Sequence, residues 1–205
     1  MKAKSSASGS VLQAFRETLW TEEEFIEKAY RIKSKAGPIV PLTFSKLQSH
    51  LYQVLAKTGT PAGSHDILKP RQAWVTSLIM AIINEKLRRN PGWTAYTLTH
   101  KEEITVELRE KFERFNELLP PSERIEPSTK REGLYVFANG SRYHIQTAGG
   151  KATGIATTIQ ILHGTEIAEW DIDERAIWNK AQEAVPLIPG ALVVRESVGG
   201  LYGGY

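Results

Sequence analysis

Three polar stretches of the chain could do chemistry, because each directly follows an apolar run that predicts a buried strand. They are residues 69–77, Thr165-Glu166 and Glu196-Ser197. In open α/β sheets the ligand lies outside the carboxyl ends of the strands, so these side chains are expected to meet at one edge. They offer a cation for phosphate, a hydroxyl for a metal ion, a carboxylate for a water molecule and a polar sensor. Nucleotide hydrolysis needs such groups, since phosphoryl transfer depends on positioning and charge neutralisation.

The first stretch belongs to residues 67–87, ILKPRQAWVTSLIMAIINEKL, which predict a strand end, a polar turn and an amphipathic helix. Such a junction directs unpaired backbone N–H groups and the positive end of the helix dipole at one place, which suits an anion. Against the phosphate-loop pattern G-x-x-x-x-G-K-[ST], residues 69–76 keep only the last position, so the motif alone is weak. The rest of the chain must supply its context.

The surrounding elements predict a parallel sheet with helices. Three capping boxes mark helix starts: Thr21 with Glu24, Ser45 with Gln48, and Asp171 with Glu174. The first helix is expected to continue past Ile32 to Gly37-Pro38. Strands are expected at residues 93–100, 158–164 and 191–197, a long helix at 104–119 and a turn-rich connection at 57–66. Alternating strands and helices are typical of a parallel sheet with right-handed crossovers.

A β-hairpin interrupts this alternation. Residues 133–150 read as two alternating strands around Asn139-Gly140, a strong hairpin signal. The Gly-rich loop at residues 148–158 follows a hairpin strand and does not precede a helix. It is therefore interpreted as a connection, with a phosphate cradle as the alternative.

Composition indicates a soluble globular protein with one domain. The chain has 205 residues, a net charge of +3 and no cysteine, which excludes disulfides and thiolate metal sites. A small excess of cations permits contact with nucleic acid without arguing for it. No apolar run is long enough for a membrane span or a signal peptide, so a cytoplasmic location is expected.

Taken together, the segments resemble the ATPase domain of the large terminase subunit of tailed bacteriophages. The resemblance runs from about Pro41 to the carboxyl terminus and is carried by KPRQ with the following Thr76-Ser77, PGWTAYTLTH, the hairpin with FANGS, TIQILHGTEIAEWD, and a last strand ending in ES. It implies a P-loop NTPase fold of the RecA-like (ASCE) type, with a mostly parallel sheet, flanking helices and an inserted hairpin. Residues 1–20 would be a disordered arm and residues 21–205 the ATPase domain, ending before any nuclease domain.

The resemblance also implies cofactors and partners. The cofactors would be ATP and Mg²⁺. The partners would be double-stranded DNA, the phage portal protein, the small terminase subunit and further copies of the chain in a ring, all in the host cytoplasm and without a membrane.

Carried over residue by residue, the resemblance assigns roles. Lys69 and Arg71 look like the phosphate-contacting cations of a variant Walker A segment, to which Pro70, Gln72 and Ser77 would also belong. Thr76 would bind Mg²⁺ through its hydroxyl. Glu166 resembles the Walker B glutamate that activates the attacking water, with Arg71 as a second catalytic residue. Gln48 resembles the adenine-recognising glutamine, and Ser197 the motif that couples hydrolysis to motion.

Each role has a plainer alternative that the sequence leaves open. Gln48 has a sufficient explanation as a capping-box residue. Lys69 and Arg71 could be cations on a solvated turn, and Thr76 or Ser77 could cap a helix. Glu166 could simply favour a helix dipole.

Four departures from the family pattern bear on turnover. Thr165 stands where many nucleotide hydrolases have a metal-binding aspartate, and Val198, Gly199 and Gly200 replace most of the coupling motif ST-x-N-G. Trp74 occupies a glycine position of the phosphate loop, where a residue with a Cβ costs about 1–2 kcal/mol if φ is positive. Ile155 replaces an arginine that could stabilise transition-state charge. The alternative to an ATPase is therefore a catalytically impaired nucleotide-binding fold with a structural or DNA-binding role in assembly.

Overall fold

The structure, a computed structural model, describes residues 21–34, 36–56, 63–71, 73–131, 133–149 and 157–199. Its centre is a sheet of seven strands in the spatial order β3-β9-β8-β4-β7-β6-β5. In chain order these are β3 (Gly63–Lys69), β4 (Thr94–Thr99), β5 (Pro127–Arg131), β6 (Leu134–Phe137), β7 (Arg142–Thr147), β8 (Ile161–Thr165) and β9 (Leu192–Val198). All neighbours from β3 to β7 are parallel, and β6 and β5 are antiparallel. The predicted mostly parallel sheet is confirmed.

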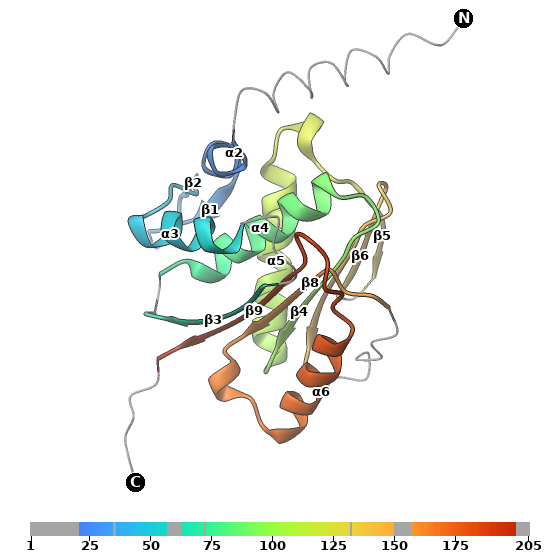
Figure 1. The fold of residues 1–205 in the computed structure, drawn as a ribbon. Helices are drawn as coiled ribbons and strands as arrows, with labels where there is room; N and C mark the ends of the chain where they lie inside the picture. The colour runs from blue at the N-terminus through green and yellow to red at the C-terminus, as the bar shows by residue number, and fades with distance from the viewer. Residues whose placement is uncertain are drawn as a thin grey trace, which may run out of the picture.

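Helices cover both faces of this sheet (Figure 1). α4 (Val75–Arg89) and α5 (Glu102–Leu118) pack on one face, and α6 (Ile172–Glu183) packs on the other. Residues 78–83 of α4 have no exposed surface, as expected for a helix that is apolar on nearly all sides. β4 is buried along its whole length because both of its faces are covered.

A small amino-terminal layer lies on α4 and α5 and contains α2 (Glu22–Ala29), β1 (Arg31–Lys33), β2 (Ile39–Pro41) and α3 (Lys46–Leu55). The prediction that the first helix continues past Ile32 is wrong. The helix ends at Ala29, and Ile32 lies on β1, paired with Val40 of β2. Tertiary packing overrides the helical periodicity here: the Tyr30 ring is fully buried, and its hydroxyl donates to Glu85 of α4 at 2.9 Å, which fixes Tyr30 in an extended conformation.

The other expectations hold with shifted boundaries. All three capping boxes are present. β3 already begins at Gly63, so residues 63–66, expected in a turn, are paired with β9 instead. An edge strand tolerates such polar residues, and the same holds for β5, which is exposed throughout and was not predicted.

The hairpin forms around Asn139-Gly140, with Gly140 at a positive φ of 82°. Its second strand, β7, pairs with β4, so the hairpin extends the parallel sheet sideways and does not stand apart from it. Two short 3₁₀ turns, η1 (Pro121–Glu123) and η2 (Ile167–Glu169), complete the described elements. Among the described residues, no helix combines the length and apolarity needed to cross a lipid bilayer.

Candidate active site

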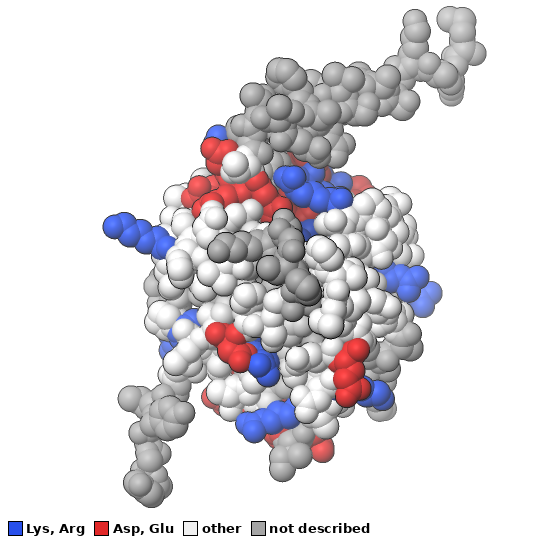
Figure 2. Space-filling view, viewed as in Figure 1, with Lys and Arg blue, Asp and Glu red and all other residues white. Residues whose placement is uncertain are grey.

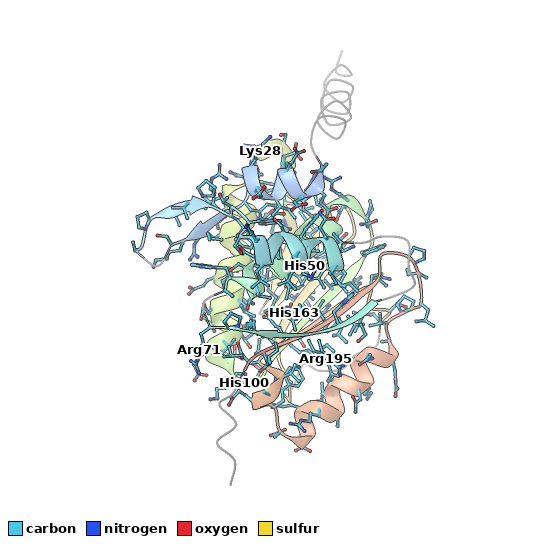
Figure 3. All side chains as sticks on the ribbon, turned by 60° about the vertical axis from the view of Figure 1, so that its left-hand side comes forward. Lys28, His50, Arg71, His100, His163 and Arg195 are labelled. Atoms are coloured by element: carbon cyan, nitrogen blue, oxygen red, sulfur yellow. The ribbon has the colours of Figure 1, made fainter. Side chains whose placement is uncertain are left out.

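The carboxyl ends of β3, β9 and β8 lie next to one another, and the polar residues predicted at these ends converge there. An open cleft of about 840 Å³ lies outside this edge; its lining includes Lys69, Arg71, His100 and Glu166. Figure 3 shows Arg71 and His100 at this end of the sheet and His163 in its interior. The volume is within the usual range for small-molecule sites.

Lys69 is the centre of the site. Its ammonium nitrogen lies 2.8 Å from Thr76 Oγ1, 3.2 Å from Glu166 Oε1 and 3.2 Å from Glu196 Oε2. The lysine is only 9% exposed, so these are ion pairs and a hydrogen bond with little competition from water. The contact with Thr76 is a hydrogen bond, and the contacts with Glu166 and Glu196 are ion pairs.

Glu166 is placed by the turn after β8. It has a left-handed backbone with φ of 54°, which few residues with a Cβ adopt, and it initiates η2. Its Oε2 accepts a hydrogen bond from the Val198 backbone N–H at 3.1 Å, while its Oε1 faces Lys69. The side chain is 24% exposed and borders the cleft, so one carboxylate reaches both the lysine and the open space.

A buried polar chain continues from Lys69 across the sheet. Glu196 Oε1 lies 3.3 Å from His163 Nε2, His163 Nδ1 lies 3.2 Å from Thr97 Oγ1, and Thr97 Oγ1 lies 2.8 Å from the Tyr143 hydroxyl. Burial raises the pKa of Glu196, but the hydrogen bond and charge of His163 and the charge of Lys69 outweigh it and lower that pKa to about 2. Glu196 is therefore an ionised carboxylate in the interior, with cationic or hydrogen-bonding groups on both sides.

The loop predicted to bind phosphate joins β3 to α4. Trp74 is the residue before α4 and has φ of 58° and ψ of 20°, the left-handed conformation expected where the family has glycine. Among the described residues, Trp74 and Glu166 are the two non-glycine residues with a positive φ. A hollow of about 250 Å³ beside the loop is lined by Lys69, Trp74, Thr76 and Ser77 together with Lys111 of α5. The indole therefore borders the space that an anion would enter.

Comparison with solved structures identifies the fold. The large terminase of bacteriophage HK97 matches with a TM-score of 0.69 and 16% identity over 86% of this chain and 36% of that chain. The chain has the fold of a large terminase. The ATPase domain of the large terminase of Thermus phage P74-26 also matches, with a TM-score of 0.46 and 14% identity over 78% of this chain and 66% of that chain. No protein-family model matches the sequence, and no curated protein matches it significantly.

The terminase fold thus extends over most of this chain, which spans about a third of the HK97 protein's length. Within it, the structure brings together Lys69, Thr76 and Glu166 as the sequence predicted. Ser77 is buried on α4, and Pro70 and Arg71 border the cleft. Two assigned positions, Gln72 and Ile155, lie outside the described residues.

Two further assigned residues have visible structural contacts. Gln48 is buried, and its Oε1 accepts from the Ser45 N–H at 2.9 Å in the capping box, so its adenine role stays a prediction. Ser197 Oγ accepts from the Ala168 N–H at 3.3 Å and so joins the end of β9 to η2. The coupling role of Ser197 stays a prediction.

From the sequence, Glu196 was expected at this edge but was given no role, and His163 and His100 were not expected in the site. The available signal was a charged Glu196 near the end of a strand that begins with apolar residues, and a His163 inside another strand. Both lie where a strand that is buried on both faces should have apolar residues.

Proposed function

We propose that this chain is the ATP-hydrolysing motor domain of a phage DNA-packaging terminase. The observation that supports this is the contact of Lys69 Nζ with both Thr76 Oγ1 and Glu166 Oε1 at the carboxyl edge of the sheet, within a terminase fold. A cation, a helix-start hydroxyl and a carboxylate at one point are the groups that phosphoryl transfer to water requires.

In the proposed reaction, Lys69 and Arg71 bind the phosphates and neutralise their charge. Glu166 orients the attacking water and accepts its proton, while the water oxygen bonds to the γ-phosphorus and the bond to the β,γ-bridging oxygen breaks, releasing ADP. Since the Lys69 ammonium already contacts three oxygens, a phosphate that binds it would displace one of them. Glu166 is the partner with access to solvent, whereas Glu196 is 1% exposed, so phosphate binding would release Glu166 toward the water.

The donor set suits Mg²⁺. Hydroxyl and carboxylate oxygens are the ligands this ion prefers, and it usually keeps several waters. Thr76 would hold it through its hydroxyl, which lies near the Glu166 and Glu196 carboxylates around Lys69. When bound, the ion would neutralise charge that develops on the phosphates.

The packaging role extends beyond this domain. By this proposal the chain works as a ring with the portal protein and the small terminase subunit in the host cytoplasm and moves double-stranded DNA. Figure 2 shows no continuous basic surface on the face it draws; carboxylates gather over α2, which carries Glu22, Glu23 and Glu24. We therefore assign no DNA-contacting residue.

Trp74 favours a second candidate, a catalytically impaired nucleotide-binding fold that serves in assembly. Its indole lines the hollow at the phosphate loop, and its backbone has the strained conformation that a glycine would adopt without cost.

Calorimetry with a nonhydrolysable ATP analogue, combined with phosphate release with and without duplex DNA, distinguishes the two candidates. The motor proposal expects Mg²⁺-dependent binding and turnover, and Glu166→Gln should keep the binding and lose at least about 10²-fold in turnover. Glu117→Gln, an exposed carboxamide substitution on α5, is the matched control. Binding without turnover supports the impaired fold, and turnover by Glu166→Gln equal to that of the wild type rejects the catalytic assignment.

A further inference from the structure

The register of the sheet places a carboxylate beside Thr165, the residue that stands where many nucleotide hydrolases have an aspartate near the metal ion. Thr165 on β8 is the partner of Glu196 on β9. Register partners of parallel strands project to the same face, and neighbouring strands are about 4.8 Å apart. The acidic group absent from β8 is therefore present one strand away.

Glu196 also faces the group expected to bind the metal. Its Oε2 lies 3.2 Å from Lys69 Nζ, which itself lies 2.8 Å from Thr76 Oγ1. Among the described residues this Oε2 is one of the few buried side-chain oxygens without a hydrogen-bond partner; its contact with Lys69 is an ion pair that lacks hydrogen-bond alignment. A buried, incompletely paired carboxylate oxygen is costly, and a cation that binds there would remove the cost.

The other carboxylate oxygen of Glu196, Oε1, is held in place by a buried histidine. His163 contacts Oε1 at 3.3 Å and is itself oriented by Thr97, and all three side chains are at most 1% exposed. Groups that hold a ligand's second atom typically orient it and tune its basicity at metal sites. The arrangement leaves Oε2 as the oxygen that points toward Lys69 and Thr76.

We propose that Glu196 supplies the acidic group of the Mg²⁺ site in place of the aspartate absent at Thr165. The inference rests on the proposed function, because Mg²⁺ would arrive with the nucleotide. Glu196 holds the ion or one of its waters, together with the Thr76 hydroxyl. Glu166, which is more exposed and borders the cleft, then stays available for the attacking water.

The test is the effect of Mg²⁺ on nucleotide binding by the full chain, measured by calorimetry with ADP and with a nonhydrolysable ATP analogue. Glu196→Gln should reduce the tightening produced by Mg²⁺ by about tenfold or more, as loss of a metal-site group does. The metal-free affinity should stay the same or improve, since a negative charge near the phosphates is removed. A merely structural role would weaken binding with and without Mg²⁺ alike, and that result overturns the proposal.

A relocated carboxylate gives a second measurement. The double variant Thr165→Asp/Glu196→Gln moves the carboxylate from position 196 on β9 to its register partner, position 165 on β8. This variant should recover part of the Mg²⁺ dependence of nucleotide binding. Should Glu196→Gln fail to fold, Glu196→Asp is the second variant. Its shorter side chain keeps the negative charge but moves the carboxylate oxygens away from Lys69 and Thr76, so it should also lose Mg²⁺ dependence. Wild-type Mg²⁺ dependence in the folded variants rejects Glu196 alone, whereas a wild type that binds no nucleotide rejects the proposed function and this inference together.

Discussion

Replacing Trp74 with glycine should leave the protein more stable than replacing it with alanine. The reason is the backbone at this position, which has φ of 58° and ψ of 20° immediately before α4. Both variants remove the same indole and therefore lose the same side-chain contacts. The difference between them isolates the cost of a Cβ in the left-handed conformation.

The size of this difference follows from two opposing effects. A Cβ in the left-handed region costs roughly 1–2 kcal/mol. Glycine loses more backbone entropy on folding, which costs about 0.5–1 kcal/mol relative to alanine in regular structure. The glycine variant should therefore be more stable by about 0.5–1 kcal/mol, which for a chain of this size corresponds to a difference of roughly 1–4 °C in Tm.

Denaturant unfolding of the two variants measures this difference, and nucleotide calorimetry on the same samples measures access to the phosphate loop. Because the indole lines the hollow beside Thr76, both variants should bind a nucleotide more tightly than the wild type, and by a similar factor. An alanine variant as stable as the glycine variant would refute the left-handed conformation. Unchanged affinity in both variants would show that the indole does not obstruct the site.

Three further predictions concern the pH dependence, the support of α4 and the catalytic turn. Burial lowers the pKa of His144 from 6.5 to about 4, so folding favours its neutral form. The free energy of unfolding should therefore fall by at most about 3 kcal/mol as the pH drops from 6.5 toward 4. In unfolding measured against pH, His144→Gln should reduce this loss. Glu85→Ala should cost about 3–5 kcal/mol in denaturant unfolding, because it removes the buried carboxylate that pairs with Arg88 at 2.8 Å and accepts from the buried Tyr30 hydroxyl, and so leaves Arg88 with Glu123 as its remaining ion-pair partner among those described. Gly164→Ala should cost about 1–3 kcal/mol and lower phosphate release, because its Cβ would meet Trp178 at 2.6 Å beneath the turn that bears Glu166.

The sequence was sufficient for the parts of the site that depend on strand order. Lys69 and Glu166 could be brought together in advance because carboxyl ends of parallel strands share one edge. Glu196 could be expected at the same edge, but no role could be assigned to it. The role proposed for it depends on pairing with Thr165, and the residues of β9 contain no information about which strand lies beside them.

The errors in the fold have the same origin. Ile32 continues the helical spacing of Phe25 and Ala29, yet the buried hydroxyl contact between Tyr30 and Glu85 ends the helix earlier. That contact joins residues 55 positions apart in the chain, so no local pattern records it. The polar edge strand β5 was missed because it packs no side chain into the core.

The buried chain from Glu196 through His163 and Thr97 to Tyr143 crosses four neighbouring strands, β9, β8, β4 and β7. A slip of one residue in any of these strands would turn its polar side chain to the opposite face of the sheet. For β8 that face is the apolar layer around Trp170 and Trp178 of the α6 side. A misaligned sheet would thus bury an unpaired polar group, so the residues of this buried chain also favour the single strand alignment in which all of them are paired.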